Sequence, residues 1–322
     1  MPVISPSQYS APFLFSNGHV QTIFASRRTV RGVQYERERI LTPDGDFLDL
    51  DWSRNGSKQI AILSHGLEGN TRRQYILGMV RALRRRGWDA LAWHYRGCSG
   101  EPNKKLRSYH SGETSDLNTI VSHVVDQNVY REIALIGFSL GGNVMLKYLG
   151  EDPLKIHPLI SKAVAFSVPC DLKSGALKLA RRSNGLYMRI FLKSLHQKVR
   201  EKMRTLPNQI NDLDFHRLKT FMDFDNRYTA PINGFRDAED YFAKCSSRQF
   251  LTAIRIPTLL VNAKNDPFLA EACFPYDEAR SNPAFFFEAP DSGGHTAFVA
   301  FGNQGEYWSE TRALCFLNGN NS

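Results

Sequence analysis

The sequence predicts an α/β fold in which a mostly parallel central sheet is flanked by helices and carries a helical cap insertion. Two observations support this prediction. Short apolar runs alternate with longer segments of helical periodicity, which is the pattern of parallel strands joined by crossover helices. The strand-like runs are also continuously apolar, as expected for a sheet that is covered on both faces. A chain of 322 residues is long enough for one such sheet and its insertion.

An antiparallel edge is expected first, from a hairpin signal within residues 34–52. Two strand-like runs there surround the turn of residues 43–46, whose sequence is Pro-Asp-Gly-Asp. Ile60–Ser64 is the next apolar run, and apolar residues at 75, 76, 79, 80 and 83 then follow helical spacing. Ala90–His94 predicts a further strand, and the apolar positions from 117 to 125 predict the next helix.

The second half of the chain continues this alternation around one long interruption. Further strands are predicted at Glu132–Phe138, Ala163–Val168, Thr258–Val261 and Ala284–Phe287, and a closing helix at 306–317. Between 171 and 256 the chain is helical and charged, with no strand-like run. We therefore expect an N-terminal extension at 1–32, an α/β core formed by 33–170 and 257–322, and a helical cap inserted at 171–256.

Composition narrows the class of protein. The five cysteines are odd in number and widely spaced, which is typical of free thiols in a reducing compartment. No apolar run is long enough to span a membrane, and the first fifteen residues lack the pattern of a signal peptide, so a cytoplasmic protein is expected. No phosphate-binding loop, dinucleotide fingerprint or zinc motif occurs, so no cofactor and no metal are expected.

The segment Gly137–Gly141 indicates a nucleophilic serine. Its sequence, Gly-Phe-Ser-Leu-Gly, lies between a predicted buried strand and a predicted helix. In the α/β-hydrolase fold such a strained turn exposes the serine hydroxyl at the carboxyl edge of the sheet. The flanking glycines are needed because side chains there would clash with neighbouring elements. The alternative is a glycine-rich turn around a buried serine. The context favours Ser139 as the nucleophile of an α/β-hydrolase fold.

A serine nucleophile requires a base and an orienting acid. His295 follows two glycines, after the last predicted strand and before the closing helix, where the chain order of this fold places the base. Asp266 follows the strand predicted at 258–261 and is the expected acid. Asp291 is a rival, but its place four residues before His295 would angle it badly. A surface histidine and an ordinary Asp-Pro turn are the alternatives to a catalytic pair.

Acyl transfer also needs donors for the developing oxyanion. The amide of Leu140, directly after the nucleophile, is one expected donor. The second is the amide of Leu67, in the loop His65–Gly69 that follows the strand predicted at 60–64. Glu68 in the same loop is interpreted as a loop anchor without a role in proton transfer.

Several of these motifs together resemble one branch of the α/β-hydrolases. They are His65–Gly69 (HGLEG), Tyr95–Gly100 (YRGCSG), Gly137–Asn143 (GFSLGGN), Asn265–Phe268 (NDPF) and Gly293–His295 (GGH). In this order they are similar to the YheT-like branch, the AB hydrolase-4 family, which includes medium-chain fatty acid ester hydrolases and ethyl ester synthases. Asn17–Ile23 (NGHVQTI) looks like the N-terminal signature of that family.

The resemblance implies the triad Ser139, Asp266 and His295, and carboxylesterase-like activity without a cofactor. Arg96 and His19 match family positions, and we interpret both as structural. Some eukaryotic relatives carry an N-terminal membrane anchor, which this sequence is expected to lack.

Much of the net charge of +9 lies in the predicted cap. Residues 171–204 hold ten Lys and Arg but only two acidic residues. Five of the basic residues would share one helix face: Arg182, Arg189, Lys193, Arg200 and Arg204. An apolar stripe would occupy another: Tyr187, Phe191, Leu195, Val199 and Met203. The helix is interpreted either as a solvated element packed on the core or as a basic surface that contacts anionic membranes or attracts acidic substrates. Nucleic acid is not an expected partner, because aromatic residues do not interleave with the basic ones.

These features predict a monomeric or weakly oligomeric serine hydrolase that cleaves small carboxylic esters with short- to medium-chain acyl groups through an acyl-enzyme. Two alternatives remain. An acyltransferase or ester synthase would use the same residues with an alcohol as acceptor. A non-catalytic binding protein could share the fold.

Overall fold

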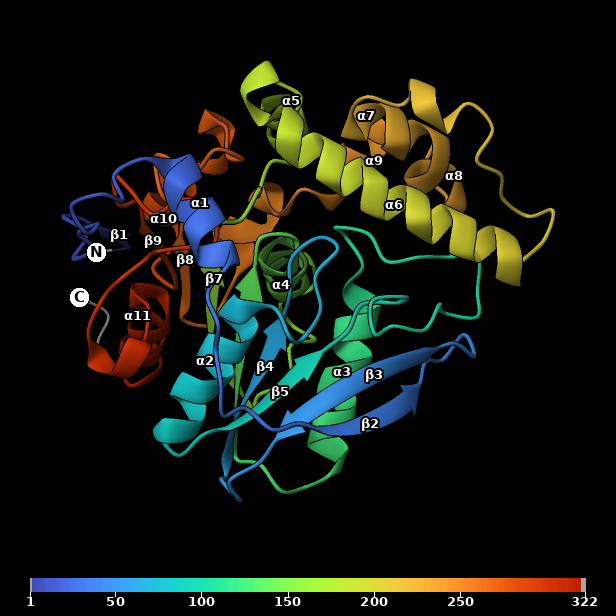
Figure 1. Cartoon of the computed structure of the whole chain (residues 1–322). Helices are drawn as coiled ribbons and strands as arrows, with labels where there is room; N and C mark the ends of the chain where they lie inside the picture. The colour runs from blue at the N-terminus through green and yellow to red at the C-terminus, as the bar shows by residue number, and fades with distance from the viewer. Residues whose placement is uncertain (1, 320–322) are drawn as a thin grey trace.

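The computed structural model describes residues 2–319, and over this range it contains one nine-stranded sheet (Figure 1). The strand order is β1-β9-β8-β7-β6-β4-β5-β3-β2. β2 and β3 form the predicted antiparallel hairpin, and β3 also lies antiparallel to β5. The remaining neighbours are parallel. The predicted class, a mostly parallel sheet flanked by helices, is confirmed.

The strands lie close to the predicted apolar runs. They are β1 (Val3–Ile4), β2 (Glu36–Leu41), β3 (Phe47–Ser53), β4 (Gln59–Ser64), β5 (Asp89–Trp93), β6 (Glu132–Phe138), β7 (Ile160–Phe166), β8 (Thr258–Val261) and β9 (Phe285–Glu288). The α-helices are α1 (Gly18–Ser26), α2 (Gln74–Arg85), α3 (Thr114–Asp126), α4 (Leu140–Glu151), α5 (Leu172–Leu179), α6 (Gly185–Thr205), α7 (Phe221–Phe224), α8 (Ala230–Ile232), α9 (Ala238–Cys245), α10 (Tyr276–Ser281) and α11 (Trp308–Leu317).

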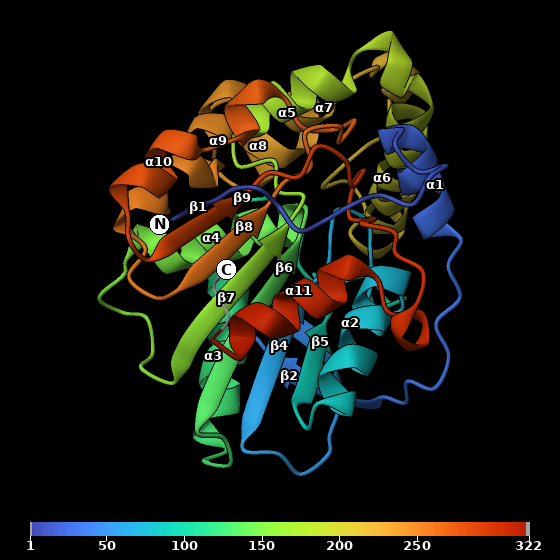
Figure 2. The same cartoon turned by 90° about the vertical axis from the view of Figure 1, so that its left-hand side faces the viewer.

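Two helical layers bury the two faces of the sheet. Alternate residues of a strand point to opposite faces. In β6, Ile133 and Leu135 accordingly belong to the apolar cluster that includes α3 and α4. Ala134 and Ile136 belong to the cluster that includes α2 and α11, and Figure 2 shows these two helices in front of the strands. Burial on both sides explains why the strands read as continuous apolar runs.

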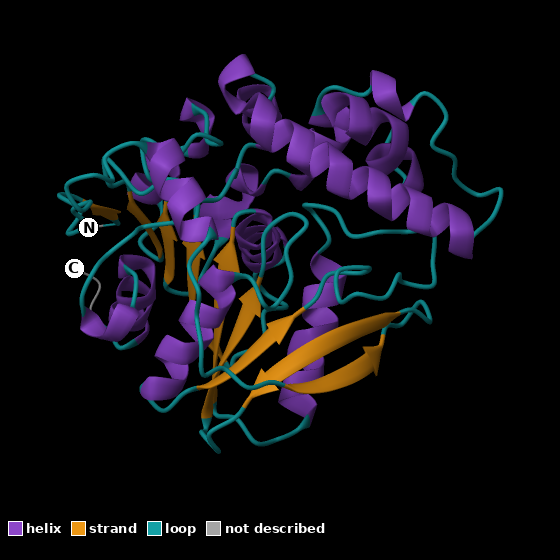
Figure 3. Cartoon of the chain, viewed as in Figure 1, coloured by secondary structure: helices purple, strands orange, loops and turns teal. Residues whose placement is uncertain are grey.

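A third layer of helices covers the carboxyl edge of the parallel strands. The helices α5 to α9 all lie between β7 and β8 in the chain, and Figure 3 shows them gathered above the sheet. They have apolar clusters of their own, one of which joins α6 to Phe215, Phe224 and Tyr228. Helices α5 to α9 therefore cover any functional groups at the carboxyl ends of the strands.

Two N-terminal elements were not expected from periodicity. Val3–Ile4 adds a parallel edge strand beside β9, and two residues are too few to show a pattern. The side chain of Asn17 caps α1 by accepting from the amides of His19 and Val20. Several apolar residues of α1 face outward, which blurs its helical signal. Within residues 2–319, no helix combines the length and apolar character needed to cross a bilayer.

Candidate active site

Ser139 occupies a strained turn between β6 and α4. Its φ of 53° and ψ of −119° are unusual for a residue with a side chain. Two backbone hydrogen bonds of Ser139 stabilise the turn. The Ser139 amide donates to the carbonyl of Phe166 at 2.9 Å, and the Ser139 carbonyl accepts from the amide of Asn143 at 3.1 Å. The glycine requirement is steric, because a Cβ on Gly141 would lie 2.4 Å from the carbonyl oxygen of Ser64. The predicted turn is therefore present, with its serine at the sheet edge.

The structure brings His295 and Asp266 to this serine. The Nε2 atom of His295 lies 2.9 Å from the Oγ of Ser139, and its Nδ1 atom lies 2.9 Å from the Oδ2 of Asp266. The Asp266 side chain is fully buried, and its Oδ1 accepts from the amide of Phe268 at 2.8 Å. The rival Asp291 is 90% exposed and pairs with Lys264. The geometry therefore selects Asp266 as the partner of the imidazole.

Backbone strain is concentrated in the loops around His295. Thr296 and Phe298 have positive φ angles of 52° and 41°, and Ser167 on the neighbouring loop has 55°. The Ser167 hydroxyl accepts from the amide of Thr296 at 2.8 Å, which ties the two loops together. Such conformations persist only where the surroundings enforce them, and they cluster at functional sites.

The N-terminal motif also belongs to this site. The hydroxyl of Thr22 on α1 accepts from the amide of His295 at 2.9 Å. Asn265 bridges the two segments, because its Oδ1 accepts from the amide of Gly294 and its Nδ2 donates to the carbonyl of Ser16. A Cβ on Gly18 would lie 1.9 Å from the carbonyl oxygen of Asn265, so α1 and the acid loop touch. Sequence reasoning singled out Asn17–Ile23 as a motif but missed this role.

The two amides expected for the oxyanion are free. Among the described residues, neither the Leu67 amide nor the Leu140 amide has an acceptor. Leu67, Leu140, Ser139 and His295 all line the same cavity. A Cβ on Gly66 would lie 3.2 Å from the Cβ of Ser139, so this loop passes directly beside the serine. Free backbone donors at such a position could hold a developing negative charge.

Comparison with known proteins identifies the family of the chain. The model of the alpha/beta hydrolase fold family matches residues 62–300. The chain belongs to this family.

The hydrolase is 34% identical to the Escherichia coli (strain K12) protein named "Putative esterase YheT", over 88% of this chain and 85% of that protein. It is 30% identical to the Mus musculus protein named "Phospholipase ABHD3", over 83% of this chain and 67% of that protein. The resemblance to the YheT-like branch is therefore confirmed. The solved structure of the Pyrococcus furiosus esterase PF2001 shares the fold, with a TM-score of 0.60 at 20% identity over 89% of this chain and 91% of that chain.

Glu68 links the predicted oxyanion loop of the hydrolase to its cap. The residue has a φ of 54°, its amide donates to the Tyr109 hydroxyl at 3.0 Å, and that hydroxyl donates to its carboxylate at 2.6 Å. Ser194 and Lys198 of α6 bind the same carboxylate, the latter at 2.9 Å. Burial raises the pKa of Glu68, but the charge of Lys198 and these hydrogen bonds outweigh it, so the pKa lies below its ordinary value. Glu68 is thus a loop anchor, as predicted, and the anchor reaches the cap.

The cavity above Ser139 has a mainly apolar lining. Helices of the cap form the side of the cavity opposite the sheet. Its lining includes Leu172, Leu179, Phe191, Leu195, Phe221, Phe224, Tyr228 and Phe268. An apolar substrate chain would gain about 25 cal/mol for each Å² of surface it buries there. Among the described residues, no group of three or more His, Cys, Asp or Glu side chains is arranged to hold a metal ion.

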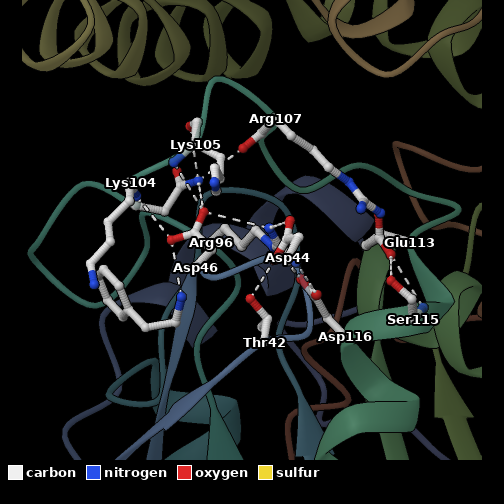
Figure 4. A network of polar contacts seen from close by, with 12 residues as sticks. Thr42, Asp44, Asp46, Arg96, Lys104, Lys105, Arg107, Glu113, Ser115 and Asp116 are labelled. Carbon is white, nitrogen blue, oxygen red and sulfur yellow. Dashed lines mark hydrogen bonds and ion pairs between the residues drawn. The ribbon is translucent and has the colours of Figure 1, made fainter.

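A buried ionic network supports one end of this cavity (Figure 4). The Arg96 guanidinium, itself in the lining, donates to both carboxylate oxygens of Asp116 at 2.9 and 2.7 Å and to Asp44 at 2.6 Å. Asn103 donates to Asp46 at 2.6 Å and accepts through its carbonyl from Lys202 of α6 at 3.0 Å. Arg96 therefore organises loops through ion pairs, in keeping with its interpretation as structural.

Proposed function

We propose that the chain is a serine esterase that hydrolyses carboxylic esters through an acyl-enzyme formed on Ser139. The observation that carries the proposal is the chain of two 2.9 Å contacts from Ser139 through His295 to Asp266, set beside two free amides. Relatives named esterase and phospholipase support ester bonds as the general target.

The geometry supports a sequence of balanced proton transfers. His295 Nε2 takes the hydroxyl proton as Ser139 Oγ attacks the ester carbonyl, and Asp266 stabilises the imidazolium through Nδ1–H. The amides of Leu67 and Leu140 hold the oxyanion of the tetrahedral intermediate. His295 then gives the proton to the departing alcohol. Water attacks the acyl-enzyme by the same route, and the carboxylic acid leaves.

The apolar lining under the cap supports short- to medium-chain acyl groups. A cap cavity with Leu, Phe and Ala walls suits an alkyl chain. An alcohol in place of water would make the same site an acyltransferase. Ester products formed in added ethanol would reveal that reaction.

Turnover of p-nitrophenyl esters from C2 to C12 tests the proposal. The wild type should show a maximum at one chain length. Ser139→Ala should lose about four or more orders of magnitude in kcat while keeping its circular dichroism spectrum. Ser183→Ala, at an exposed cap position, is the matched control. A folded wild type that neither turns over any ester nor reacts with a fluorophosphonate probe would overturn the proposal in favour of a binding role.

We also propose that the outer face of α6 contacts anionic membrane surfaces. Arg189, Lys193 and Arg204 are exposed on this helix, and Leu186 and Ile190 are exposed beside them. Basic residues interleaved with apolar ones are the pattern of a helix that lies in a membrane interface.

A further inference from the structure

The cap wall of the catalytic cavity contains a carboxyl group that the proposed mechanism does not use. Asp225 lines the same cavity as Ser139 and His295. Another carboxyl group in the lining, that of Glu201, lies one helical turn from Gln197 on the outer surface and accepts a hydrogen bond from it. Asp225 shares the lining with the apolar side chains of Phe221, Phe224 and Phe242.

The local backbone of Asp225 is unusual. It begins a π-helical turn, Asp225–Thr229, in which the amide of Ala230 bonds to its carbonyl across five residues. A π turn inserts a residue into the helical register, and such turns recur at functional sites. The side chain is half-buried, and it lines the cavity.

The carboxyl group of Asp225 is only partly satisfied. Its Oδ1 accepts from the Thr229 hydroxyl at 2.5 Å. Across residues 2–319 it has no other hydrogen bond and no Lys, Arg or His within ion-pair distance. A carboxylate has about four lone-pair positions, so several remain open. A bound group that donates a hydrogen bond would satisfy these positions.

Burial also changes the pKa of this carboxyl group. Burial raises the pKa of Asp225 from 3.8 to about 7, against the weaker opposing effect of the Thr229 hydrogen bond. Burial, and after it the charge of Asp225, raises the pKa of Tyr241, whose ring also lines the cavity. With its pKa raised to about 7, the carboxyl group would be partly ionised near neutral pH, in a residue that lines the catalytic cavity.

We propose that Asp225 recognises a hydroxyl group on the acyl chain of the substrate, so that the enzyme prefers hydroxyacyl esters to plain alkyl esters. This inference rests on the proposed esterase function. A hydroxyl donates to the carboxylate and can also accept from the protonated acid, so it matches both states. An ammonium group matches only the ionised state, and a methyl group leaves the carboxyl unpaired. Sites built to bond a substrate hydroxyl discriminate strongly against analogues that lack it.

Paired ester series test the inference. The p-nitrophenyl esters of ω-hydroxyalkanoic acids from C6 to C12 are compared with alkanoates of equal heavy-atom number. In the wild type, kcat/KM should favour the hydroxy ester by about tenfold or more at one chain length, where the hydroxyl reaches Asp225. Asp225→Leu should lower kcat/KM for that ester by about tenfold to a hundredfold and raise it for the alkyl ester. Asp225→Asn, which keeps a donor and an acceptor, should retain part of the preference.

Asp277→Leu, on the exposed first turn of α10, is the matched control and should leave the preference unchanged. Equal effects of Asp225→Leu on both series, or a wild type without preference at any length, would overturn the inference and leave the esterase function standing. Should neither series turn over, the esterase function fails. Calorimetric binding of the free hydroxy and alkyl acids to Ser139→Ala then decides the inference, and equal affinities would overturn it.

Discussion

The sheet edge and the helical cap form opposite walls of one cavity, but they are built differently. At the sheet edge, backbone geometry positions the groups: Ser139 and Glu68 have positive φ angles, and Gly141 has no room for a Cβ. In the cap, apolar packing around α6 and a few polar links such as Lys198 to Glu68 hold the helices in place. The candidate catalytic groups thus lie where the backbone is tightly constrained, and the cap helices supply much of the apolar lining.

This difference predicts where substitutions act. A change at the sheet edge should remove catalysis without altering which ester is preferred. A change in the cap should alter preference, stability or surface binding. Contacts that join the two regions should affect both.

The largest effect is expected at the sheet edge, from Asp266→Asn. Loss of the carboxylate removes the group that orients the His295 ring, and kcat should fall by about 10⁴-fold. Asp291→Asn should leave kcat nearly unchanged because Asp291 is exposed and paired with Lys264. Turnover of the best p-nitrophenyl ester measures both. Similar losses in the two variants would contradict the assignment of the acid.

The next effect concerns the cap and its stability. Because the pKa of Asp225 is raised to about 7, the folded state holds more protons than the unfolded state between about pH 4 and pH 7. The stability of the wild type relative to Asp225→Asn should therefore fall as pH rises through this window. A rise in pKa from 3.8 to about 7 corresponds to about 4 kcal/mol, and because Asp225 is only half-buried we expect about half of that, about 2 kcal/mol. Urea unfolding at pH 4.5 and pH 7.5 measures the difference. Asp277→Asn is the control, and a difference independent of pH would refute the prediction.

Glu68→Gln should affect the link between the two regions. It leaves the half-buried Lys198 without its carboxylate and weakens the bond that holds the positive φ of residue 68. We expect kcat to fall about tenfold to a hundredfold with a smaller change in KM, because the oxyanion amides act in the transition state. Glu239→Gln, which breaks an exposed ion pair with Lys173 within the cap, should have little effect. A change confined to KM would assign Glu68 to substrate binding.

A smaller effect is expected from Thr22→Val. The substitution keeps the shape of the side chain but removes the acceptor for the His295 amide, so kcat should fall about tenfold. Thr119→Val is the matched control. The hydroxyls of Thr22 and Thr119 each donate to the carbonyl four residues earlier, but only that of Thr22 also bonds to His295. If both variants lose the same activity, helix stability rather than histidine position is responsible.

The smallest effect is expected on the outer surface of the cap. Arg189→Gln should weaken binding to vesicles containing phosphatidylserine by about fivefold, because each basic residue near such a surface contributes about 1 kcal/mol. Arg280→Gln, exposed on α10, is the control. Co-sedimentation measures the binding, and turnover of a water-soluble ester should be unchanged. Equal binding by the wild type and both variants would argue against membrane contact through α6.

Local patterns determined much of the architecture. The runs at Glu132–Phe138 and Thr258–Val261 coincide with β6 and β8, because strands buried on both faces are apolar throughout. The residues Ser139, Asp266 and His295 could be chosen from sequence because each follows a strand, and parallel strands bring their carboxyl ends to one edge. The steric need for glycine around Ser139 is also visible in the sequence, as Gly137 and Gly141.

Other features were decided only by the tertiary structure. Val3–Ile4 is a strand because β9 offers it a partner, and Thr22 reaches the amide of His295 across most of the chain length. The partners of Glu68 come from α6, and the open lone pairs of Asp225 depend on which side chains surround it. Periodicity reports the burial of a residue along its own element, whereas hydrogen bonds and ion pairs depend on atoms that only folding brings together.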